Sequence, residues 1–151
     1  MAINPLAAAK RMCERSGYEL SNLSLQKILY LAHMYHLGIH GTPIVGGNFQ
    51  AWDLGPVHPR IYNYVIVFGV TPVGNIFRSI DNADEGTETY IIDQATDQLK
   101  GKHPASLVGI THRNDGAWAK NYEPGRNNLI PNNDIKMEYE EMKSLKEKED
   151  D

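Results

Sequence analysis

Hydrophobic residues recur with the period of an α-helix along most of this chain. The first such segment begins with Asn4 and Pro5, which are typical of a helix start, and is followed by Gly17, which is typical of a helix end. Its apolar positions follow the helical spacing: Leu6, Ala9, Met12 and Cys13. The same signals predict further helices from Pro59, from Asn133, and over residues 23–40, 87–99 and 103–111.

The segment 23–40 is the most apolar of the predicted helices. Ser21, Asn22 or Ser24 is suited to cap it, and Gly41 to end it. Its main apolar stripe, widened by Leu31, Met34 and Leu37, comprises Leu25, Ile28, Leu29, Ala32, Tyr35 and Ile39. We therefore expect this helix to be buried on most sides, at the centre of the domain.

Short extended segments are predicted between the helices. Residues 48–54 alternate between apolar and polar as a strand does, and Gly55-Pro56 is expected to turn the chain. Residues 73–80 fit an edge strand, and residues 81–86 a loop. Trp118 is expected in a later loop rich in Asn, Asp and Gly.

These elements predict a mainly α (α+β) fold: a compact single-domain helical bundle with a small β-hairpin or short strands. We expect residues 1–142 to form the domain and residues 143–151 to form a charged C-terminal tail. No internal repeat or interdomain linker divides the sequence.

Composition narrows the possible partners. The 151 residues carry 15 Lys and Arg against 19 Asp and Glu, so the formal net charge is -4. This balance disfavours a broad electrostatic grip on nucleic acid or on an anionic membrane. No apolar run approaches the roughly 20 residues that cross a bilayer, and the N-terminal residues lack the pattern of a signal peptide. We therefore expect a cytoplasmic protein.

Three histidines on the second helix are the residues best spaced for metal chemistry. His33, His36 and His40 recur at i, i+3 and i+7, so they share one side of the helix. A metal-dependent hydrolase would also use a neighbouring carboxylate as a base, yet residues 24–41 contain no acid. The pattern favours a partly solvated polar edge, with the hydrolase as the alternative.

Other sequence signals for chemistry are weak. The sequence has no nucleophile elbow, phosphate-binding glycine loop or dinucleotide fingerprint, which disfavours an enzyme. The single cysteine, Cys13, falls on an apolar helix face and is predicted to be a core residue. Lys10, Arg11 and Arg15 are predicted to form a solvated basic face, because the apolar second helix is unsuited to reading DNA bases.

Three motifs together carry a family resemblance. The first is LQKILY at 25–30, continuing through YHL at 35–37 to GTP at 41–43. The second is AWDLGPV at 51–57, followed by Ile61-Tyr62. The third is LVGITH at 107–112, followed by Trp118, Ile130, Asp134 and Ile135. In this order and spacing, over about residues 6–142, the sequence resembles the Panacea domain of SocA-like and GepA-like proteins from bacteria and phages.

The resemblance implies an antitoxin that needs no cofactor and binds a cognate toxin protein encoded beside it. In one branch of the family, the antitoxin is an adaptor that delivers the toxin to an ATP-dependent protease. The positions that match the family motif, and so the candidates for partner binding, are Lys27, Tyr30, Trp52, Gly55, Pro56, Thr111, His112 and Trp118.

The resemblance also implies roles for some of these residues. Thr111 is expected to hold the end of its helix, with His112 and Trp118 closing the same side. Trp52 is expected in the core, where its truncation to Ala would misfold the protein. Gly55, Pro56 and Trp118 are likewise expected to serve the scaffold.

Overall fold

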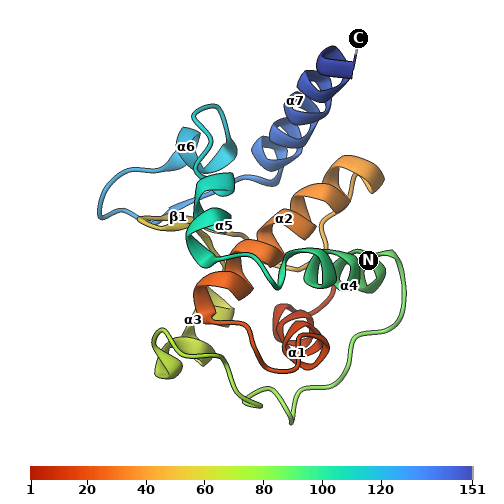
Figure 1. The fold of residues 1–151 in the computed structure, drawn as a ribbon, viewed down its shortest axis with the longest axis vertical. Coiled ribbons are helices and arrows are strands. Elements are labelled where there is room, and N and C mark those ends of the chain that lie inside the picture. Colours follow the sequence, from red (N-terminus) through yellow and green to blue (C-terminus); the bar gives the residue numbers. More distant parts are fainter. Residues whose placement is uncertain (151) are drawn as a thin grey trace.

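The computed structural model describes residues 1–150 of the chain. The elements in chain order are α1 (Pro5–Arg15), α2 (Asn22–His40), β1 (Gln50–Trp52), β2 (Gly55–Val57), α3 (Pro59–Val65), the 3-10 helix η1 (Ile66–Phe68), α4 (Thr87–Leu99), α5 (Pro104–Thr111), α6 (Ala117–Asn121), β3 (Asn128–Leu129) and α7 (Asn132–Asp150). The helices pack around α2, and a small antiparallel sheet lies at one side of the molecule, on the left of Figure 1. This arrangement confirms the predicted mainly α (α+β) class.

The two N-terminal helices begin and end where their local sequence indicates. The Asn4 side chain caps α1 by accepting a hydrogen bond from the backbone N–H of Leu6. Ser21 caps α2 by accepting from the N–H of Ser24, and Gly41 ends it in the left-handed conformation. Cys13 is buried in the core, as predicted, and burial raises its pKa to about 12.

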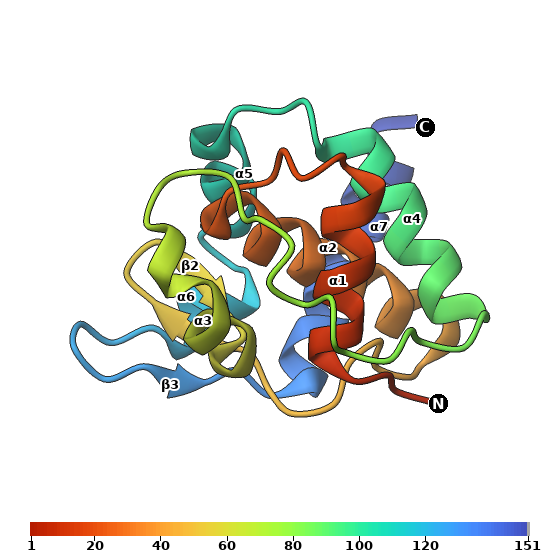
Figure 2. The same ribbon diagram turned by 90° about the horizontal axis from the view of Figure 1, so that it is seen from below.

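Helix α2 is the centre of the molecule, as its apolar composition predicts. It packs against α1, α4, α5, α7 and β2, which surround it in Figures 1 and 2. The prediction is wrong for Tyr35 and Ile39, which are 45% and 48% exposed. The reason is the crossing with α7, where the ring of Tyr139 occupies the space beside Gly38. Tyr35 packs only edge-on against Tyr139 at this crossing, and Ile39 and His40, which follow it, are exposed.

The sheet has the strand order β2-β1-β3, with both pairings antiparallel. Ala51 faces Pro56 in the β1–β2 hairpin, and Trp52 faces Gly55. The turn therefore falls at Asp53 and Leu54, and the prediction that Gly55-Pro56 turns the chain is wrong. These two residues instead begin β2.

Residues 69–86 form an irregular strap across α1, seen in Figure 2. The predicted edge strand over 73–80 is wrong, because this segment is held by buried side chains rather than by a strand ladder. Val73 and Phe77 are buried, and the N–H of Val73 donates to the carbonyl oxygen of Leu20. The strap thus covers the side of α1 that faces away from α2.

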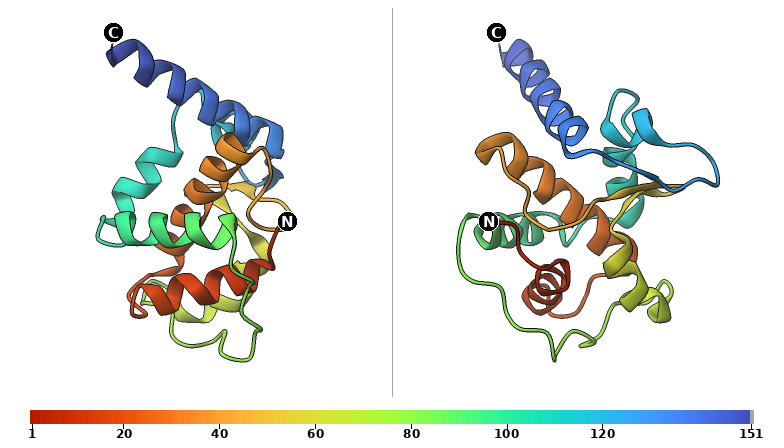
Figure 3. Two further views of the ribbon diagram at one scale, coloured as in Figure 1. Left: turned by 90° about the vertical axis from the view of Figure 1, so that its right-hand side faces the viewer. Right: turned by 180° about the vertical axis from the view of Figure 1, so that it is seen from behind.

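The C-terminal part of the chain is more helical than its sequence indicates. Trp118, predicted in a loop, lies in the short helix α6. Helix α7 includes the charged residues from 143 to 150, and its end projects away from the other helices (Figure 3). Within the described part of the chain, no helix combines the length and the apolar character that a membrane crossing requires.

Candidate functional site

A buried lysine connects the central helix to the β1–β2 hairpin. Lys27 of α2 has no exposed surface, and its Nζ donates to the carbonyl oxygen of Pro56 at 2.8 Å. No carboxylate in the described chain lies within ion-pairing distance of Lys27. Burial lowers the pKa of Lys27 to about 7, because the charged ammonium loses its hydration. This lysine fixes the position of β2 on α2.

Gly55 allows the lysine to pass beneath the hairpin. Its φ is +117°, a value that favours glycine. A Cβ at this position would lie 2.7 Å from Cε of Lys27 and 2.9 Å from Oγ1 of Thr111. The Thr111 hydroxyl in turn donates to the carbonyl oxygen of Val108 at 3.0 Å, near the end of α5. Helices α2 and α5 and strand β2 therefore meet at one glycine.

An aromatic stack closes the other side of the hairpin. The indole Nε1 of Trp118 donates to the carbonyl oxygen of Trp52 at 2.7 Å. The rings of His112 and Trp118 stack with centroids 3.8 Å apart, and the rings of Trp118 and Tyr122 stack with centroids 4.6 Å apart. Partial burial lowers the pKa of His112. The stack thus ties α6 to β1 through a backbone carbonyl.

Trp52 itself is half-buried, so the prediction that it lies in the core is wrong. Its ring packs edge-on against Tyr62 of α3, with centroids 4.6 Å apart, and its Nε1 donates to the Gln50 side chain. The side chain lies at the border between the core and the surface because Gln50–Trp52 is a strand with one face toward solvent.

Seven of the eight motif residues thus gather around the hairpin, and Tyr30 does not. The Tyr30 hydroxyl donates to Oε1 of Glu138 at 2.7 Å, and burial raises the Tyr30 pKa well above its ordinary value. Glu138 is buried and also accepts from the N–H of Ala117 at 3.1 Å. This link joins α2, α6 and α7.

Glu138 is a structural residue that motif analysis missed. The available signal was its position three residues after Ile135, on the apolar face of the last predicted helix. A carboxylate at such a position indicates a buried partner.

A cleft of about 610 Å³ opens beside the hairpin, between the start of α2, α3 and the segment after η1. We call it the hairpin cleft. Its apolar lining includes Trp52, Leu54, Val57, Tyr62 and Val70. Gln26 and Lys27 lie at its α2 side, and Asp53 lies in the turn between β1 and β2. These elements lie together on the left of Figure 1.

The three histidines of α2 do not form a common site. His33 contacts the Asn132 side chain at 3.0 Å, whereas His36 lies between the carbonyl oxygen of Thr42 and the hydroxyl of Thr87. Both are fully buried, so the predicted solvated edge is wrong for them. Burial lowers the pKa of His33 to about 4. Within residues 1–150, no three His, Cys, Asp or Glu residues are grouped as metal ligands would be.

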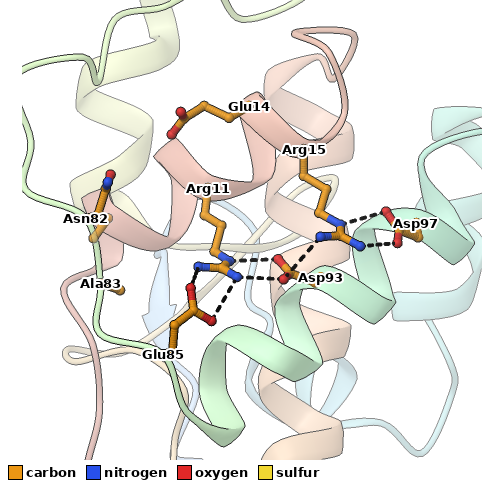
Figure 4. A pocket seen from close by; sticks show the side chains of 9 residues that line it. Arg11, Glu14, Arg15, Asn82, Ala83, Glu85, Asp93 and Asp97 are labelled. Carbon is orange, nitrogen blue, oxygen red and sulfur yellow. Dashed lines mark hydrogen bonds and ion pairs between the residues drawn. The ribbon is translucent and has the colours of Figure 1, made fainter.

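The two arginines of α1 are paired with acids and Lys10 is bonded to a backbone carbonyl, so the predicted solvated basic face is wrong. Arg11 forms a bidentate hydrogen-bonded pair with Asp93 of α4, at 2.8 and 2.7 Å (Figure 4). Arg15 pairs with Asp97 one turn further along. Lys10 donates to the carbonyl oxygen of Ile80 in the strap. These contacts hold α1 to α4 and to the strap.

Comparison with known proteins places this fold in a family. Residues 25–119 match the family described as antitoxin SocA-like, Panacea domain. The chain is also 36% identical over 111 residues to the antitoxin SocA of Caulobacter vibrioides (strain NA1000 / CB15N). That similarity covers 66% of this chain and 58% of the relative, so the match includes little more than half of the relative's length. No solved structure matches the chain.

The class defined by the fold and the motif is therefore a Panacea domain. The chain belongs to the antitoxin SocA-like family, because the family match covers more than half of its residues and includes all eight motif positions.

Proposed function

We propose that this protein is an antitoxin that neutralises a cognate toxin protein by binding it directly, without catalysis. The observation that carries the proposal is the match to the antitoxin SocA-like family, which includes the hairpin and its supporting residues. A second support is the similarity to the protein named antitoxin SocA of Caulobacter vibrioides, which is 36% identical to this chain over 111 residues.

The geometry around the hairpin supports binding rather than chemistry. Lys27 is enclosed beneath β2 and bonded to Pro56. The neighbouring hairpin cleft is open and mostly apolar, and its walls are fixed by hydrogen bonds within the fold. A preformed apolar surface gains binding free energy from water release and loses little conformational entropy on association.

The proposal is tested by co-expressing the protein with the product of the adjacent gene. If that product is toxic, we expect growth to be restored and the two proteins to purify as one complex. The matched control is Leu145→Asp, which changes an exposed leucine at the projecting end of α7, away from the hairpin. It is expected to rescue growth when folded. A toxic neighbour that neither binds nor is neutralised would contradict the proposal.

The same cells distinguish direct neutralisation from delivery to a protease. Direct neutralisation predicts an unchanged toxin half-life after translation is stopped, with the toxin recovered in the complex. The adaptor alternative predicts a toxin half-life that shortens only when this protein is present and lengthens again when the ATP-dependent protease is deleted.

A further inference from the structure

We propose that the hairpin cleft is the surface that holds the toxin, and that the toxin fills it with an apolar side chain flanked by a basic one. This inference rests on the proposed function, which supplies the toxin as the partner. It adds the location of the contact and the chemistry of the segment that makes it.

Exposed aliphatic side chains at the hairpin cleft indicate that its partner contributes an apolar side chain. Leu54 is 58% exposed and Val70 is 94% exposed, and both line the hairpin cleft. In the same segment, Ile66 and Val67 of η1 are 53% and 76% exposed. Grouped exposed aliphatic residues are typical of surfaces that bind another protein. Trp52 adds the kind of half-buried aromatic wall that anchors tight contacts.

The hairpin is held rigidly enough to serve as such a wall. On its α2 side, the Gln26 side chain accepts a hydrogen bond from the N–H of His58 at 2.8 Å, and Lys27 donates to the carbonyl oxygen of Pro56. On its α6 side, the indole of Trp118 donates to the carbonyl oxygen of Trp52. Contacts on both sides of the two-stranded unit keep the cleft open before the partner arrives, which lowers the entropic cost of binding.

The charge of the cleft indicates the flanking basic residue. Two charged residues line it, Lys27 and Asp53. Lys27 is fully buried and its Nζ donates to the carbonyl oxygen of Pro56, whereas Asp53 is exposed in the turn. Asp53 accepts from the Tyr122 hydroxyl through Oδ1 and has no basic partner within ion-pairing distance in the described chain. The charge presented to a partner is therefore negative, and it favours Lys or Arg beside the apolar anchor.

Two matched pairs of variants test the inference against the product of the adjacent gene. Leu54→Asp places a charge in the cleft at a turn position that suits Asp. Its control, Leu145→Asp, changes a leucine of similar exposure, 51%, at the projecting end of α7. Asp53→Lys reverses the charge at the cleft, and its control, Asp84→Lys, reverses an exposed carboxylate in the strap.

We expect Leu54→Asp to weaken the complex about 30-fold, as truncation of a central contact does. Asp53→Lys is expected to slow association about threefold to tenfold, since it replaces attraction with repulsion. Added salt should slow association for the wild type and much less for Asp53→Asn. The two control variants should bind within about twofold of the wild type. Circular dichroism verifies that all of the variants are folded.

The outcomes separate this inference from the proposed function. If the wild type neither binds nor neutralises the toxin, the proposed function fails. If the wild type binds but folded Leu54→Asp binds equally well, or Leu145→Asp loses as much affinity, the cleft assignment is wrong. Faster association of Asp53→Lys would show an acidic partner segment and overturn the charge assignment. Self-association of the wild type that Leu54→Asp abolishes would assign the cleft to a second copy instead.

Discussion

Replacing Gly55 by Ala tests whether the hairpin rests on the lysine beneath it. The φ of +117° costs an L-residue about 1–3 kcal/mol. The added Cβ would lie 2.7 Å from Cε of Lys27 and 2.9 Å from Oγ1 of Thr111, and overpacking of this kind costs about 1–3 kcal/mol more. We therefore expect a total loss of about 4 kcal/mol, a large part of the roughly 5–15 kcal/mol by which a domain is stable.

Two other glycines separate backbone strain from crowding. Gly41→Ala has a φ of +75° with no atom within 4 Å of the added Cβ, so it should cost about 1–2 kcal/mol from strain alone. Gly46→Ala has neither feature and should stay within about 0.5 kcal/mol of the wild type. Urea unfolding followed by circular dichroism measures all three changes.

A double-variant cycle then identifies the crowding partner. Lys27→Ala removes the side-chain atoms nearest to the added Cβ. The combined Gly55→Ala and Lys27→Ala variant should lose less than the sum of the single losses, by about 1–3 kcal/mol. Strict additivity, or a Gly55→Ala protein as stable as Gly46→Ala, would refute the packing of Lys27 beneath the hairpin.

Three further predictions concern buried polar groups. Tyr30→Phe should lower the free energy of unfolding by about 1–3 kcal/mol, because Glu138 loses a buried hydrogen-bond donor. Tyr18→Phe, at a surface position, should change the free energy of unfolding little. Equal losses for the two variants would contradict this account. Because burial lowers the pKa of His33 to about 4, the unfolded chain binds its proton more tightly, and stability should fall as the pH drops from 6.5 toward 4. Urea titrations should show a smaller fall for His33→Gln, and an identical fall would be inconsistent with a buried neutral imidazole. Burial lowers the pKa of Lys27 to about 7, so stability should rise between pH 7 and 9, and Lys27→Met should remove this rise. A wild type with no such rise would contradict the burial of this lysine.

The ends of most helices were predictable because their signals are local. Asn4 with Pro5, and Ser21 with Gly41, act within a few residues of the backbone groups that they satisfy. The family motif also indicated which residues gather near Lys27, although sequence reasoning alone did not explain why.

The misplaced turn shows where local signals fail. Gly-Pro is a common turn sequence, but Gly55 is required here because Lys27 approaches from a helix 28 residues earlier in the chain. The same limit applies to the histidines of α2. Nε2 of His33 contacts the Asn132 side chain and Nε2 of His36 contacts the Thr87 hydroxyl, and both of these partners are distant in sequence. Their burial follows from tertiary contacts that helical periodicity does not describe.

One long-range contact did leave a signal. Arg11 and Arg15 are four residues apart in one predicted helix, and Asp93 and Asp97 have the same spacing in another. Matching spacings of opposite charge on two helices indicate an ion-pair ladder between them, which the structure contains. A basic cluster considered alone gave the wrong prediction of a solvated face.

The most direct test of the account is the hydrogen-exchange footprint of the toxin on this protein. The complex with the adjacent gene's product is compared with the free protein, residue by residue. We expect new protection of backbone amides at residues 52–57 and 66–70, and unchanged exchange at the projecting end of α7. Protection confined to α7, with the hairpin exchanging as in the free protein, would contradict the assignment of the hairpin cleft as the toxin-binding surface.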